Sequence, residues 1–216
     1  MAQAISYYGL LAIETLFNVF GLRLYEEPRH TIIDRVETVE IRRYDPRVAA
    51  AVEFLPGEAG RGEAFKLLFA YISGANTKAD RIAMTAPVAV GENLAAKDQG
   101  AKDEEGGARE RLAMTAPVLS SDSKLAFYLP AAYDLATAPT PLDARVKIEA
   151  VPAQTVAVLR FSGFGGIAWL RQRQLVSTLA PSKWRPVGEA FMLYYDAPFT
   201  LPFLRRNEAA VVVEAR

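Results

Sequence analysis

The chain of 216 residues contains no cysteine and only one histidine, His30. Without cysteine it has no disulfide framework, no thiolate nucleophile and no cysteine-ligated metal. A single imidazole also excludes a metal site built from several histidines, and no Ser-His-Asp triad can be placed. The acidic residues lie mainly in charged, solvated runs, so no acid–base pair stands out. The sequence therefore shows no catalytic constellation.

An excess of positive charge is also missing. Lys and Arg number 25, and Asp and Glu number 25, so the formal net charge is zero. Proteins that bind nucleic acid normally carry a basic excess or a basic face, and we expect no nucleic-acid partner here. The length suffices for one large domain or two small ones with a sizeable core.

The longest apolar stretch, residues 7–20, is shorter than the roughly 20 residues that a membrane-spanning helix needs. It also lacks the positive start of a signal peptide, which favours the cytoplasm and leaves the periplasm open. Its larger apolar residues recur at helical spacing, at Leu10, Ile13, Phe17 and Phe20. We predict an amphipathic helix within residues 1–24 that docks on the domain, on a second subunit or on a membrane surface.

One heptapeptide occurs almost twice. Residues 82–88 read IAMTAPV and residues 112–118 read LAMTAPV. The two copies predict neighbouring strands whose side chains Met84 and Met114 face one interior, each strand ending or bulging at its proline. The intervening residues 91–111 are charged, small and polar, and they predict a mobile hairpin loop.

A longer internal similarity relates two halves of the chain. Residues 39–54 and 146–161 align without gaps at an offset of 107, each with a strand, a break near a proline and an apolar run. In each half a glycine-bearing turn follows, and then a predicted helix, over 63–73 in the first half and 167–179 in the second.

Two strands are expected after each helix, which gives a repeated βαββ pattern. The strands lie in the heptapeptide copies and at 125–129 in the first half, and at 190–195 and 209–214 in the second. The pattern predicts an α+β fold, with a curved, mostly antiparallel sheet or a distorted β-barrel and two main helices. We expect a single domain over 25–216, with pseudo-repeats at about 36–130 and 145–214.

Several sequence blocks, in order along the chain, resemble the SOUL/haem-binding-protein family. They are YEEP at 25–28, VEIRRY at 39–44, YISGAN at 71–76, both MTAPV copies, RVKI at 145–148 and PFTLPFLRRNE at 198–208. The resemblance covers roughly residues 25–214. It implies binding of haem or a related tetrapyrrole in an apolar groove beside the first helix, with basic residues near the propionates and no axial ligand common to all members.

Carried onto this chain, the resemblance places Phe65, Phe69 and Ile72 in the groove. The two phenylalanines lie four residues apart, on one helix face, where their rings can stack on a flat macrocycle. Lys66 and Arg61 are the cations that can pair with propionates. The helix is otherwise very apolar, and most basic positions expected along it are replaced. The aromatic pair would equally serve as ordinary core packing.

Three side chains are candidate iron ligands. Met84 and Met114 offer thioethers, although methionines also fill gaps in a sheet interior. His30 offers the only imidazole, although it lies in an extended segment where an exposed side chain is expected. The residues RRNE at 205–208 are most simply a turn.

Three functions remain open. The first is a non-enzymatic carrier or buffer of haem or another tetrapyrrole. The second, which only the resemblance implies, is an enzyme that modifies the tetrapyrrole, for instance by removing iron. The third is a small-molecule sensor or protein-interaction module, because fold alone does not determine function.

Overall fold

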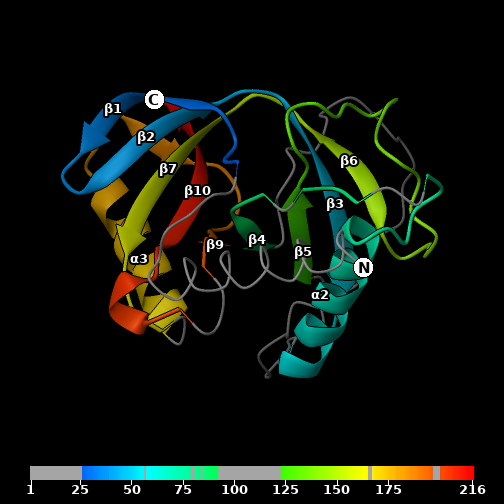
Figure 1. Ribbon diagram of the computed structural model, residues 1–216. Coiled ribbons are helices and arrows are strands. Elements are labelled where there is room, and N and C mark those ends of the chain that lie inside the picture. The colour runs from blue at the N-terminus through cyan, green and yellow to red at the C-terminus, as the bar shows by residue number, and fades with distance from the viewer. Residues whose placement is uncertain are drawn as a thin grey trace, which may run out of the picture.

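The computed structural model describes residues 26–55, 57–78, 81–83, 85–91, 123–164, 167–196 and 200–216. These residues form ten strands, two α-helices and one short 3₁₀ helix (Figure 1). The elements are β1 (His30–Val36), β2 (Val39–Tyr44), β3 (Arg47–Phe54), α2 (Glu58–Ile72), β4 (Val88–Gly91), β5 (Ser123–Tyr128), β6 (Lys147–Val151), β7 (Gln154–Phe161), α3 (Ala168–Leu179), β8 (Trp184–Pro186), β9 (Phe191–Tyr194), η2 (Pro202–Leu204) and β10 (Asn207–Ala215).

All strand pairs are antiparallel, and they form one sheet in the order β1-β2-β7-β10-β9-β4-β5-β3-β6, with β8 paired to the end of β10. Within the described part of the chain, β1 and β6 end the sheet and do not pair with each other. The sheet is therefore open. The predicted α+β class and its antiparallel sheet are confirmed, and the sheet does not close into a barrel.

The sheet has two halves, because two pairs of consecutive strands cross between them. β2 runs into β3 through Asp45 and Pro46, and β6 runs into β7 through Pro152 and Ala153. Proline lacks the N–H group that a strand donates to its neighbour, so the strand pairing is interrupted at both links. Before and after these links, β2 pairs with β7 and β3 pairs with β6. The centre of the sheet lies between β9 and β4. From there the strand order is β4-β5-β3-β6 in one direction and β9-β10-β7-β2 in the other, so each strand of one half has a counterpart at the same place in the other half. A duplicated unit would give this order, although the duplication itself stays a prediction.

Buried side chains form three clusters. One lies on the sheet face turned away from both helices and includes Tyr44, Tyr128 and Tyr195. A second lies between the sheet and α2, and a third lies between the sheet and α3. In Figure 1 α2 and α3 lie in opposite halves of the molecule. Each half of the sheet therefore has its own helix-covered core.

Helix α2 begins at Glu58, five residues earlier than the predicted start at 63. Two glycines that we expected in the preceding turn lie inside the helix. A Cβ at Gly60 would collide with the carbonyl oxygen of Leu55, so the connection from β3 approaches the helix more closely than alanine would allow. The true turn glycine is Gly57, with a φ of 126° that favours glycine. Helix α3 begins at Ala168, within one residue of its prediction.

The first heptapeptide copy precedes a strand instead of forming one, so this prediction is wrong. Strand β4 begins at Val88, the last residue of the copy. Ahead of it, the Thr85 hydroxyl donates to the Tyr128 carbonyl, and the Ile82 N–H donates to the Ile72 carbonyl at 2.8 Å. These bonds fix an irregular segment, and Pro87 cannot donate to a ladder.

Three predictions lie outside the described residues. They are the N-terminal helix, the second heptapeptide copy and the loop at 91–111 apart from Gly91. Among the helices that the structure describes, none combines the length and the hydropathy needed to cross a membrane.

Candidate functional site

Helix α2 carries two partly exposed aromatic side chains, Phe65 and Phe69, along the side of the face that packs on the sheet. The packed face is buried against β3 and β5 through Ala64, Leu68 and Tyr71. Phe65 and Phe69 retain 40% and 49% of their exposed surface. The helix therefore does not use this pair for its main packing.

The two rings lie nearly parallel. Their centroids are 6.2 Å apart and their planes differ by 10°. Phe65 also meets the edge of Phe127 on β5, at 5.5 Å and 70°, which fixes its orientation from below. Parallel, exposed aromatic faces are suited to stacking against a flat conjugated molecule.

Two cations flank the aromatic pair. Arg61 precedes Phe65 by four residues and so lies on the same helix stripe. It also contacts the Tyr194 hydroxyl: burial raises the pKa of Tyr194, and the charge and hydrogen bond of Arg61 oppose that rise. Lys66, beside Phe65, is exposed. Carboxylates at the edge of a stacked ligand would meet positive charge here.

The other predicted site residues lie elsewhere. Ile72 is buried in the core between α2 and the sheet, so its side chain does not lie on the exposed face. His30 begins β1, where it is half-buried, with Nδ1 3.1 Å from the Pro28 carbonyl oxygen and its ring 4.9 Å from that of Tyr44. Tyr44 faces the cluster on the helix-free side of the sheet. The structure therefore does not bring His30 to the aromatic pair.

Two of the three candidate iron ligands cannot be placed relative to the aromatic pair. Met84 and Met114 lie outside the described residues. A search of the described part of the chain finds no group of three His, Cys, Asp or Glu side chains that could hold a metal ion.

A buried charge cluster that was not predicted is centred on Glu208. Its side chain is 0% exposed at the start of β10, so the expected turn at 205–208 is wrong beyond Arg206. Arg42 of β2 donates to its two carboxylate oxygens at 2.9 and 3.1 Å. The Tyr195 hydroxyl donates at 2.7 Å and Arg206 at 2.8–2.9 Å.

The cluster reaches the first described residues of the chain. Arg206 also donates to Glu27, at 2.9 and 3.1 Å, and its guanidinium lies 3.8 Å from the Tyr195 ring centroid. Burial would raise the pKa of Glu208, but the charges and hydrogen bonds of Arg42 and Arg206 outweigh it and lower that pKa. A carboxyl group held ionised in this way is a poor general acid near neutral pH. The cluster joins β2, β10 and the segment before β1.

The sequence contained one signal for this cluster. Residues alternate between the two faces of a strand, so the pattern in β2 places Arg42 on the same face as Tyr44. An arginine at an inward position needs a buried anion, and Glu208 is that anion.

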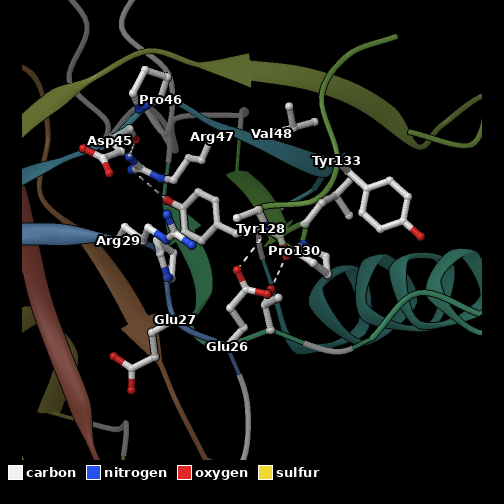
Figure 2. Close-up of a pocket in the computed structure, with 14 residues that line it drawn as sticks. Glu26, Glu27, Arg29, Asp45, Pro46, Arg47, Val48, Tyr128, Pro130 and Tyr133 are labelled. Atoms are coloured by element: carbon white, nitrogen blue, oxygen red, sulfur yellow. Dashed lines mark hydrogen bonds between the residues drawn. The ribbon is translucent and has the colours of Figure 1, made fainter. Parts of the chain in front are cut away.

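A pocket of about 180 Å³ lies where the chain crosses between the halves of the sheet. Figure 2 shows Arg47 and Tyr128 meeting in it, and the Arg47 guanidinium lies 4.8 Å from the Tyr44 ring and 4.6 Å from the Tyr128 ring. Pockets for drug-sized ligands usually occupy about 300–1,000 Å³. At about 180 Å³ this pocket is too small to enclose a tetrapyrrole.

Comparison with known proteins agrees with the sequence resemblance. The family model described as SOUL heme-binding protein matches residues 25–212. The chain belongs to the SOUL haem-binding protein family. It is also similar to Heme-binding protein 2 from Homo sapiens, at 32% identity over 181 residues, which cover 81% of this chain and 77% of the relative.

Solved structures share the fold of this SOUL-family chain at low identity. The C-terminal domain of EcmrR matches with a TM-score of 0.57 and 10% identity, over 82% of this chain and 98% of that domain. A hydrolase from Listeria innocua matches with a TM-score of 0.54 and 9% identity, over 82% and 92%. These likenesses show the fold alone.

The SOUL-like sequence blocks coincide with the buried charge cluster more than with α2. Glu27 lies in the YEEP block, Arg42 in the VEIRRY block, and Arg206 and Glu208 in the final block. These four residues therefore stabilise the contact between β2, β10 and the segment before β1.

Proposed function

We propose that this chain binds haem or a related tetrapyrrole on the outer face of α2, as a non-enzymatic carrier or buffer. The observation that carries the proposal is the parallel, exposed pair Phe65 and Phe69 in a chain of the SOUL family. The similar human protein is named for haem binding.

The residues on this face fit such a ligand. The macrocycle would lie against the aromatic pair and remove apolar surface from water, which is the main source of affinity for a flat apolar molecule. Arg61 and Lys66 would attract the propionates, and Arg61 is held near its position by Tyr194. Haem, when bound, supplies an iron centre with visible absorption.

The described residues bring no imidazole to this face, since His30 packs against Tyr44. Stacking and ion pairing would therefore supply the affinity, and the ligand would exchange readily. Such a ligand suits a carrier better than a redox enzyme, whose axial ligands tune the iron.

The test is an absorption titration of the purified protein with ferric haem, with Phe69→Ala, His30→Ala and Ile33→Ala alongside wild type. Ile33 on β1 is 47% exposed, which matches the 49% of Phe69 and makes it the control. We expect saturable binding by wild type. Losing one stacked ring costs about 1.4 kcal/mol, so Phe69→Ala should weaken Kd about tenfold. His30→Ala and Ile33→Ala should bind as wild type does.

Other outcomes point to the other functions. Association that does not saturate, or that Phe69→Ala leaves unchanged, overturns the site and favours a sensor or interaction module. Saturable binding followed by loss of the iron-dependent spectrum over time would indicate an iron-removing enzyme.

A further inference from the structure

A second exposed apolar surface lies at the start of α3, in the other half of the molecule from the α2 face. We name it the α3–η2 patch. Its members are large apolar side chains that are 37–71% exposed: Phe164, Ile167, Trp169, Leu170, Leu201 and Phe203. Monomeric proteins rarely expose so many large apolar side chains together without using them.

Hydrogen bonds hold the two segments of the patch together. The Gly163 N–H donates to the Pro202 carbonyl at 2.9 Å, and the Asn207 side chain donates to the Gly163 carbonyl at 2.9 Å. The Arg205 guanidinium lies 5.2 Å from the Phe164 ring centroid. In Figure 1 η2 lies beside the start of α3. The patch is therefore one continuous surface.

The fold does not need the outward face of α3 for its core. Leu175 and Leu179 are fully buried against the sheet, and they fix which side of the helix faces inward. Trp169, Arg173 and Val176 fall on the other side and are exposed. A helix with this arrangement presents aromatic and cationic groups outward together.

The sequence around α3 is mainly basic, although Glu189 lies next to Ala190, whose carbonyl accepts a hydrogen bond from Gln172 of α3. Residues 150–188 contain five basic residues and no acidic one, in a chain whose net charge is zero. Lys183 pairs with Asp34, and Arg185 pairs with Glu214. Arg173 is exposed on the outward side of α3 without an acidic partner on its own helix, whereas Arg171 lies 5.4 Å from the Phe161 ring and donates to Gln174.

We propose that the α3–η2 patch binds the surface of a membrane that contains anionic lipids. Tryptophan and phenylalanine at the boundary of headgroups and acyl chains, with arginines near anionic headgroups, are the combination that interfacial binding uses. The large apolar side chains of the patch are exposed, and a lipid surface accepts exposed aromatic and basic side chains without a preformed recess.

The chain provides its own reporter for this surface. It has two tryptophans, and the indole of Trp184 donates to Asp34 at 2.7 Å, whereas Trp169 is 59% exposed in the patch. In a Trp184→Phe variant, fluorescence comes from Trp169 alone. We expect a blue shift with phosphatidylcholine vesicles that contain phosphatidylserine, quenching by brominated acyl chains in them, and little change with phosphatidylcholine alone.

Co-sedimentation with the same vesicles tests the charge contribution. Each basic residue near an anionic surface contributes about 1 kcal/mol, so Arg173→Ala should lower the partition coefficient about fivefold. Lys147→Ala, at an exposed position on β6, is the matched control and should bind as wild type does. Trp169→Ser should weaken binding, and added salt should weaken the wild type further.

Several results would overturn the proposal. One is equal binding to neutral and anionic vesicles, or binding that Arg173→Ala and Trp169→Ser leave unchanged, which would assign membrane contact to another segment. Another is that the Trp169 indole of the Trp184→Phe variant is already protected from fluorescence quenching by acrylamide when no lipid is present. Shielding that grows with protein concentration would identify a second copy on the patch, and shielding independent of concentration would identify another part of this chain. Phe69→Ala should not alter vesicle binding, which keeps this test separate from haem binding.

Discussion

Replacing Glu208 by glutamine should destabilise the fold by about 3–5 kcal/mol, the usual cost of removing one member of a buried ion pair. The carboxylate is fully buried and accepts hydrogen bonds from Arg42, Arg206 and Tyr195. Glutamine has nearly the same shape but no charge, and its amide group turns a donor toward one of the guanidinium groups. Arg42 and Arg206 would then lose their one fully buried anion and keep only their partly exposed partners, Glu40 and Glu27.

The effect should depend on pH in a defined direction. The pKa of Glu208 is lowered from its ordinary value of 4.5 because the charges of Arg42 and Arg206 outweigh burial. A carboxyl group with a lowered pKa contributes its full stability above the unfolded value, and it loses that stability as the pH falls through the folded value. The difference in unfolding free energy between wild type and Glu208→Gln should therefore be constant above about pH 4.5 and shrink below it.

Urea unfolding, followed by far-ultraviolet circular dichroism, measures this difference. Glu214→Gln is the control, because Glu214 lies on the same strand in an exposed pair with Arg185. Exposed pairs contribute about 0.2–1 kcal/mol, so this variant should stay within 1 kcal/mol of wild type. If Glu208→Gln behaves like Glu214→Gln, or if its deficit persists unchanged in acid, the buried cluster does not hold β2 and β10 together as argued.

Two further predictions concern α2. Tyr71→Phe removes a hydroxyl that donates to the Pro139 carbonyl at 2.9 Å and should cost about 1 kcal/mol in urea unfolding. Burial raises the pKa of Tyr71 from 10 to about 12, so the unfolding free energy of wild type should fall as the pH rises from 10 to 12. Tyr71→Phe should lose less stability over this range. Parallel curves of unfolding free energy against pH for the two proteins would contradict this. Gly60→Ala should lower the melting temperature although alanine favours helices, because its Cβ would collide with the Leu55 carbonyl; Gly62→Ala, with open space around it, should raise or preserve it.

The periodic parts of the fold could be predicted from the sequence. Strands β3 and β7 span 47–54 and 154–161, at the 107-residue offset that the sequence alignment gave. Apolar alternation and its interruption by proline suffice for such elements. The start of α2 could not be predicted, because the decisive contact at Gly60 is with a backbone carbonyl that folding brings close.

For the proposed site, only the helical spacing of its aromatic residues could be predicted from the sequence. The four-residue interval between Phe65 and Phe69 placed both on one face, and the structure leaves both exposed. Their exposure could not be read from the sequence, since the same spacing describes a core. The burial of Ile72 and of Glu208 could not be read from the sequence. Glu208 of β10 meets Arg42 of β2 across the intervening strand β7, and only the folded sheet brings these two residues together.

The 107-residue spacing also relates the buried positions of the two helices. Leu68 of α2 and Leu175 of α3 are separated by this spacing, and both are fully buried. Ile72 and Leu179 are separated by it as well, and both are buried. The outward positions have no such correspondence, because Phe65 in α2 is matched by a glutamine in α3, and Phe69 by a valine. The inward residues of both helices are constrained by the same kind of packing against a sheet. The exposed residues are not constrained in this way, apart from the contact of Phe65 with Phe127, so the two helices can carry different exposed side chains. This difference is the reason that we propose different ligands for the aromatic pair on α2 and the patch on α3.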